Sequence, residues 1–230
     1  MIKKFGFEDF QIKKLSLNAQ KYFTDTAENK FIKFEGTSDY ITKLLRYVEK
    51  NNYKKILYFL GTKGCGKSTL LLTFVQYIHS IKQNWGTIYF NVRYLNNLSL
   101  VENKINLLKE SLYLFSNLDE LQKFKDYQPF KNIFEISFPI FTIKHFIKEV
   151  INNYNNIFLQ NKECIVFIID NFQIEDETEV NCLKDIIRYI TSAPFNLKLI
   201  ISGLGKFFGE KIRKHFLKSV NNNESVIYMD

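Results

Sequence analysis

Short apolar runs of strand length alternate along the chain with longer segments in which apolar residues recur at helical spacing. The runs lie at residues 56–60, 164–169 and 197–201 and are rich in isoleucine, leucine and phenylalanine. A strand that is apolar at nearly every position is typical of a parallel sheet buried on both faces. The alternation predicts an α/β fold with a mainly parallel sheet between helices.

The remaining elements follow from the same two periods. Helical spacing predicts a helix that opens at residues 36–39 and ends near residue 51, and further helices at 69–81, 98–118, 141–158 and 178–191. Strand-like runs at 87–92 and 224–229 bring the expected number of strands to five. We therefore expect three layers, with one sheet between two layers of helices.

The first strand runs directly into a glycine-rich segment, residues 61–68, with the sequence GTKGCGKS. It matches the phosphate-binding pattern G-x-x-x-x-G-K-[ST] in the order strand, loop, helix that the pattern requires. Backbone N–H groups of such a loop surround a phosphate, Lys67 brings positive charge to the β and γ oxygens, and Ser68 offers a hydroxyl to magnesium. The predicted nucleotide-binding residues are Gly61, Thr62, Lys63, Gly64, Cys65, Gly66, Lys67, Ser68 and Thr69.

The apolar strand at 164–169 ends on a carboxylate, Asp170. The carboxyl end of a parallel strand places this charge at the edge of the sheet where the phosphate loop begins. The expected role of Asp170 is to hold Mg²⁺ together with Ser68, commonly through a coordinated water. The alternative is an aspartate that only caps the following turn.

With a phosphate loop after strand one, Asp170 after strand three and polar Ser202 at the end of strand four, the chain resembles the additional-strand (ASCE) branch of P-loop NTPases. Within it the chain looks most like archaeal-type ATPases and STAND NTPases, relatives of AAA+ proteins. Phe34-Glu35-Gly36 is similar to the F-x-G-R box of that group, with Thr37 in place of arginine, and Asp170-Asn171-Phe172-Gln173 is similar to D-E-F-Q. A weaker likeness is to the NTPase module of Crinkler-type proteins. The resemblance covers residues 34–203 and implies ATP and Mg²⁺ as ligands.

The resemblance also implies roles for three further kinds of residue. Family members place glutamate after the Walker B aspartate, but this chain has Asn171, which can position a water and cannot accept its proton. We therefore expect slow hydrolysis unless a carboxylate among residues 175–177 reaches the site. Ser202 stands at the position of a polar sensor for the γ-phosphate or the water, or is a plain strand-end residue. The predicted catalytic residues are Lys67, Asp170, Asn171 and Ser202; Arg93, Arg188 and Arg213 are candidate arginine fingers or surface salt-bridge residues.

The predicted domain organisation is simple. Residues 1–35 form an N-terminal arm, and residues 36–230 form the P-loop NTPase domain, with a helical insertion at 98–160 before the strand that ends on Asp170. No C-terminal lid domain is evident.

Composition adds expectations about partners and location. The net charge is +8 over 230 residues, with lysine spread throughout, which favours nucleic-acid contact without locating it. Cys65, Cys164 and Cys182 show no metal-ligand spacing and fit a reducing compartment. There is no secretory signal and no apolar run of about 20 residues, so we expect an intracellular protein, cytoplasmic or nuclear, without membrane contact.

These observations leave three functional interpretations open. The leading one is a nucleotide-dependent switch or motor module that binds ATP with Mg²⁺ and hydrolyses it slowly. The second is a hydrolysis-deficient scaffold that binds nucleotide and mediates contact with a partner protein, nucleic acid or further copies of the chain. A small-molecule kinase fits the segments around Phe34 and Asp170 poorly.

Overall fold

The computed structural model describes residues 37–49, 55–81, 84–92, 139–153, 163–172, 177–204 and 224–229. The strands are β1 (Ile56–Gly61), β2 (Trp85–Asn91), β3 (Cys164–Phe172), β4 (Leu197–Leu204) and β5 (Glu224–Met229). The helices are α2 (Thr37–Glu49), α3 (Lys67–Ile81), α8 (Pro139–Asn152) and α10 (Glu177–Ser192). All five predicted strands are present, and none of these described helices is long and apolar enough to cross a membrane.

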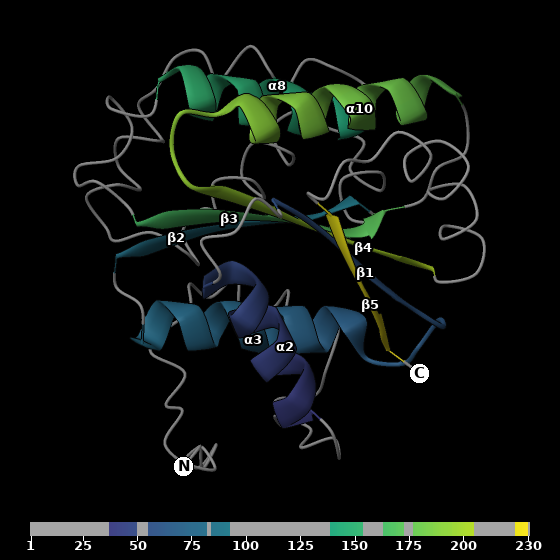
Figure 1. The fold of residues 1–230 in the computed structure, drawn as a ribbon. Helices are drawn as coiled ribbons and strands as arrows, with labels where there is room; N and C mark the ends of the chain where they lie inside the picture. Colours follow the sequence, from purple (N-terminus) through teal and green to yellow (C-terminus); the bar gives the residue numbers. More distant parts are fainter. Residues whose placement is uncertain are drawn as a thin grey trace, which may run out of the picture.

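The strands form one sheet in the order β2-β3-β4-β1-β5, and every pairing in it is parallel. The chain crosses the sheet in one direction from β1 to β2 and returns through β3 to β4. Because crossovers between parallel strands are almost always right-handed, this reversal places the connecting helices on opposite faces. Helices α2 and α3 cover one face and α8 and α10 the other (Figure 1). The predicted three-layer α/β fold is confirmed.

Two apolar clusters form the core, one on each face of the sheet. The first joins the strands to α8 and α10, and the second joins them to α2 and α3. Alternate residues of β1, β2, β3 and β4 enter different clusters: on β1, Tyr58 belongs to the first, whereas Leu57 and Phe59 belong to the second. Burial on both faces explains why these strands are apolar throughout. The same alternation determines on which face of the sheet Asp170 and Ser202 lie.

The element boundaries differ from the predicted ones by small shifts with clear causes. Strand β2 begins at Trp85 because Trp85 and Gly86 pair in register with the first residues of β3. Strand β3 continues past Asp170 to Phe172 through an irregular register. The predicted arm at 1–35 and the predicted helix at 98–118 lie outside the described residues, as do residues 205–223. Helix α8, inside the range predicted as an insertion, packs against α10 in the first cluster.

The three cysteines are free thiols. Burial raises the pKa of both Cys164 and Cys182 to about 12, because desolvation disfavours the thiolate. These two therefore remain neutral packing residues at physiological pH. Cys65 is half-buried in the phosphate loop.

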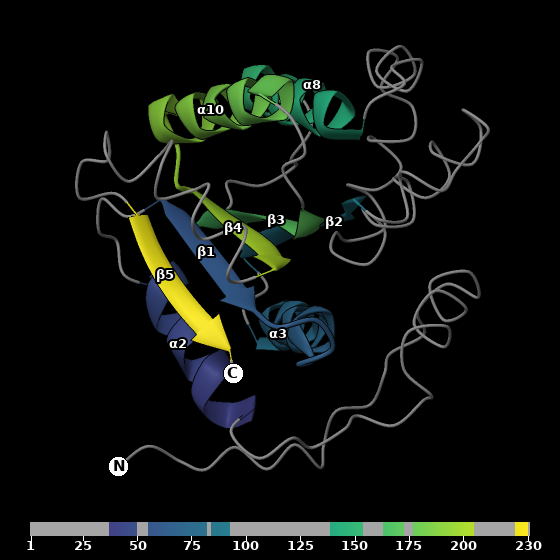
Figure 2. The same ribbon diagram turned by 90° about the vertical axis from the view of Figure 1, so that its right-hand side faces the viewer.

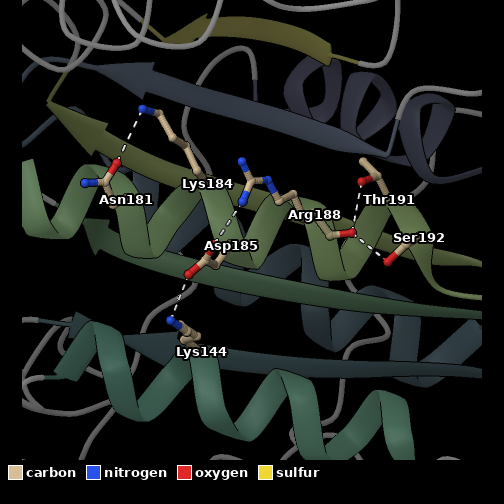
Figure 3. A network of polar contacts seen from close by, with 7 residues as sticks. All are labelled: Lys144, Asn181, Lys184, Asp185, Arg188, Thr191 and Ser192. Atoms are coloured by element: carbon tan, nitrogen blue, oxygen red, sulfur yellow. Dashed lines mark hydrogen bonds and ion pairs between the residues drawn. The ribbon is translucent and has the colours of Figure 1, made fainter.

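Polar contacts tie the two helices of one layer together (Figure 3). Lys144 of α8 donates to Asp185 of α10 at 2.8 Å, and Arg188 approaches the other carboxylate oxygen of Asp185 at 3.4 Å. The Arg188 carbonyl accepts bonds from the hydroxyls of Thr191 and Ser192, which close the last turn of α10. The hydrogen bond to Asp185 raises the pKa of Lys144 above its ordinary value of 10.5.

A double-mutant cycle on Lys144→Ala and Asp185→Ala tests this tie. We expect a coupling free energy of about 0.5 kcal/mol in urea unfolding at neutral pH. A raised lysine pKa stabilises the fold below the unfolded value of 10.5, so the coupling disappears as the pH rises through the higher folded value. The control is the Arg188–Asp185 cycle, in which the arginine side chain is 77% exposed and less coupling is expected. Coupling between Lys144 and Asp185 that persists well above pH 10.5 would contradict this assignment.

Candidate nucleotide-binding site

The phosphate loop connects β1 to α3 and depends on two glycines in the left-handed region of backbone conformation. Gly64 has a φ of 86° and Gly66 a φ of 92°, values that other residues rarely adopt. The loop then enters the helix, where the Leu70 N–H donates to the Gly66 carbonyl at 2.9 Å. The backbone therefore has the turn that the motif predicts, with a helix N-terminus directly after it.

Gly61, the first residue of the loop, must be glycine because of close contacts and not because of its backbone conformation. A Cβ atom at this position would lie 2.4 Å from the carbonyl oxygen of Met229 and 2.8 Å from Cys65 Sγ. Met229 is opposite Gly61 in the register between β1 and β5. The end of the last described strand thus packs directly against the start of the phosphate loop (Figure 2). Sequence analysis missed this contact, because only the strand order brings residues 61 and 229 together.

Lys67 is buried, and its ammonium group lies inside the curve of the loop. Nζ donates to the carbonyl oxygens of Gly61 at 3.1 Å and Thr62 at 2.6 Å, and it lies 3.5 Å from Cys65 Sγ. Neutral carbonyls are weaker partners for an ammonium group than anionic oxygens. The loop therefore holds the positively charged Lys67 ammonium group in place. This group can exchange its two carbonyl partners for phosphate oxygens.

Strand alternation brings the polar strand-end residues to the face that carries α3. Ile168 belongs to the cluster under α2 and α3, so Asp170, two residues later, has the same orientation. Ser202 pairs in register with Phe59, another member of that cluster. Asp170 and Ser202 are both fully buried. They lie on β3 and β4, at the carboxyl edge where β1 enters the phosphate loop.

Asp170 accepts hydrogen bonds at both carboxylate oxygens. The Tyr89 hydroxyl donates to Oδ2 at 2.6 Å, and the backbone N–H of Asn171 donates to Oδ1 at 2.8 Å. No ion pair of Asp170 with a cationic side chain occurs among the residues that the structure describes. The buried carboxylate is held by neutral donors, which leaves its negative charge for an external cation.

Asn171 connects the two predicted metal-binding residues. Its amide nitrogen lies 3.4 Å from Ser68 Oγ and 3.4 Å from Asp170 Oδ2. Its φ is 55°, the only positive value of a non-glycine residue in the described part of the chain. Asparagine tolerates this left-handed conformation better than glutamate does. Strand β3 thus makes a local left-handed turn at Asn171. The families that the sequence resembles carry glutamate at this position.

Ser202 Oγ has no hydrogen-bond partner among the residues that the structure describes, although the side chain is fully buried. Buried hydroxyl groups are almost always bonded, so an exception indicates a partner outside the described chain. The hydroxyl lies on the face and at the edge where the phosphate loop begins. A phosphate oxygen or a water is a suitable partner for it.

The side chains present here fit a magnesium ion. Mg²⁺ prefers hard oxygen ligands and usually takes one or two from the protein and the rest from phosphate and water. The Ser68 hydroxyl and the Asp170 carboxylate are oxygen donors that share the Asn171 amide as a neighbour. Both are therefore ligands of the kind that Mg²⁺ takes from a protein.

Among the described residues, two other predicted participants lie on α10. Arg188 lies on α10 in the ion pair with Asp185, which agrees with the surface salt-bridge alternative. Glu177 is exposed at the start of α10. Arg93, Arg213 and the carboxylates at 175 and 176 lie outside the described residues, as does the box at 34–36. Tyr89, in contrast, was not predicted as a site residue.

Comparisons with known proteins give a structural likeness only. No protein-family model matches the sequence, and no curated protein matches it. Drosophila ORC bound to poly(dA/dT) DNA and Cdc6 matches 100% of this chain and 37% of that chain, with 10% identity and a TM-score of 0.52. Drosophila ORC bound to DNA matches 93% of this chain and 32% of that chain, with 11% identity and a TM-score of 0.51. The chain thus spans about a third of these proteins, and identities this low show the fold alone.

Replacing Gly61 by alanine tests the packing of β5 against the loop. We expect a loss of about 1–3 kcal/mol in unfolding free energy, because the new methyl group meets a backbone carbonyl that cannot move independently of β5. The double variant Gly61→Ala/Cys65→Ala removes the sulfur contact and leaves the Met229 contact. Full rescue of stability in that variant would show that the Met229 carbonyl does not restrict position 61.

Proposed function

We propose that this chain is an ATP-binding P-loop NTPase domain with slow, Mg²⁺-dependent hydrolysis that acts as a nucleotide-dependent switch or motor module. The observation that carries the proposal is the grouping of Lys67, Ser68 and Asp170. The ammonium group lies within the phosphate loop, and the hydroxyl and the carboxylate share the Asn171 amide. Charge for phosphate and oxygen ligands for a metal therefore occur at one edge of the sheet.

Strand order supports placement in the additional-strand branch. Strand β4 lies between β1, which carries the phosphate loop, and β3, which carries Asp170. Ser202, near the end of this intervening strand, has a buried hydroxyl without a partner in the described part of the chain, which supports a role as a sensor of the γ-phosphate or attacking water. The preference for ATP over GTP comes from the family resemblance and not from a residue described here.

Each residue has a distinct part in the proposed mechanism. Lys67 exchanges its loop carbonyls for β and γ oxygens and stabilises the charge that develops on them. Ser68 and Asp170 hold Mg²⁺, which, when bound, neutralises charge on the phosphates. Asn171 and Ser202 orient the attacking water through hydrogen bonds. Neither the amide of Asn171 nor the hydroxyl of Ser202 is an effective general base. We therefore expect these residues to position the water without removing its proton efficiently.

The alternative is a nucleotide-binding scaffold without turnover. Asn171 favours it, since an amide stands next to Asp170 where a carboxylate base is expected. Phosphate release measured in the wild-type chain separates the two functions.

DNA is the partner class that we propose for either function. The chain has a net charge of +8, and the similar Drosophila ORC proteins were solved bound to DNA. Neither observation identifies a contact surface on this chain. A partner protein or further copies of the chain are the other candidates for what a nucleotide switch would control.

Replacing Lys67 by alanine tests nucleotide binding. Loss of a buried charge-assisted contact to phosphate is expected to weaken ATP affinity by about 100-fold, measured by calorimetric titration. Lys148→Ala, an exposed lysine on α8, is the matched control and should leave the affinity unchanged. Undiminished ATP affinity in the Lys67 variant would refute the site assignment.

Replacing Asn171 tests hydrolysis. Asn171→Asp supplies a carboxylate and tolerates the left-handed backbone, whereas Asn171→Glu supplies the family residue and costs about 1 kcal/mol of stability. We expect phosphate release to rise roughly tenfold or more in at least one of these variants. Asn181→Asp, exposed on α10, controls for the added charge. Turnover that stays at the wild-type level in both variants would show that Asn171 does not limit hydrolysis.

A further inference from the structure

Tyr89 contributes the shortest hydrogen bond to the proposed metal site. It lies on β2, two residues before the end of the strand, and its side chain is almost fully buried. Its hydroxyl donates to Asp170 Oδ2 at 2.6 Å, a length typical of a charge-assisted O–H···O⁻ bond. The Asn171 amide approaches the same oxygen at 3.4 Å and therefore contributes less.

The two short donors together fix the plane of the carboxylate. The Asn171 backbone N–H holds Oδ1 and the Tyr89 hydroxyl holds Oδ2, so rotation about the Cβ–Cγ bond of Asp170 would break both bonds. One donor is a backbone N–H, which only a proline substitution would remove. The other comes from a different strand and is a single hydroxyl group. Outer hydrogen bonds of this kind orient carboxylates that hold metals.

Resting on the proposed function, we propose that Tyr89 is a positioning residue that orients the Asp170 carboxylate toward Mg²⁺ and thereby sets the metal affinity of the nucleotide complex. Tyr89 does not touch the nucleotide in this role and acts only through Asp170. Its loss changes the metal dependence of binding and leaves metal-free nucleotide affinity unaltered. A purely structural tyrosine would affect stability alone.

The test is Tyr89→Phe, which removes one oxygen atom and keeps the ring. A fluorescent ADP analogue is titrated in EDTA and then over a Mg²⁺ series, so that metal-free affinity and the Mg²⁺ concentration for half-maximal enhancement are both measured. We expect unchanged affinity in EDTA and about a tenfold higher Mg²⁺ requirement. An equal or lower Mg²⁺ requirement than in the wild type overturns the inference.

Tyr47→Phe is the matched control. Tyr47 belongs to the same apolar cluster as Tyr89, and its buried hydroxyl donates to the Leu199 carbonyl at 3.3 Å, away from Asp170. The Tyr47→Phe variant should have a changed thermal stability and an unchanged Mg²⁺ requirement. A rise in its Mg²⁺ requirement equal to that of the Tyr89→Phe variant also overturns the inference. Failure of the wild-type chain to bind nucleotide would instead refute the proposed function itself, and the inference with it.

Discussion

A carboxylate with no exposed surface must find its hydrogen-bond donors within the protein, and Asp170 finds two short ones on neighbouring segments. The Tyr89 hydroxyl comes from β2, and the Asn171 N–H comes from the turn at the end of β3. Neither donor carries a charge, so the site retains net negative charge beside the positive phosphate loop. This separation of charge is what a magnesium–nucleotide complex, cationic at one end and anionic at the other, would complement.

The sheet makes that juxtaposition possible because its interior strands are buried on both faces. Residues of alternating orientation feed two apolar clusters along most of each interior strand, and Asp170 and Ser202 follow toward the carboxyl edge. The chain reverses its direction across the sheet between β1 and β4. Helices α3 and α10 consequently leave on opposite faces (Figure 1). By strand alternation, Asp170 and Ser202 lie on the face that carries α3.

Sequence reasoning predicted local features well and tertiary contacts poorly. The phosphate loop could be predicted because the spacing of its glycines indicates the backbone conformation. The interior strands β1, β3 and β4 could be predicted because strands buried on both faces are apolar at nearly every position. Tyr89 was not identified, since its role depends on the pairing of β2 with β3. The contact of Met229 with Gly61 depends on β5 lying beside β1, which no local pattern reports. The sequence indicates the left-handed turn at Asn171 only weakly, because asparagine is common in this conformation but also occurs in others.

The central claim is that Lys67, Ser68 and Asp170 form one magnesium–nucleotide site. A crystal structure of the chain with Mg²⁺ and a non-hydrolysable ATP analogue tests it most directly. The account predicts triphosphate density within the loop, Lys67 Nζ moved from the Gly61 and Thr62 carbonyls to phosphate oxygens, and Mg²⁺ about 2.1 Å from Ser68 Oγ. Triphosphate bound elsewhere, or a loop in which Lys67 keeps both carbonyl contacts at saturating nucleotide, would contradict it.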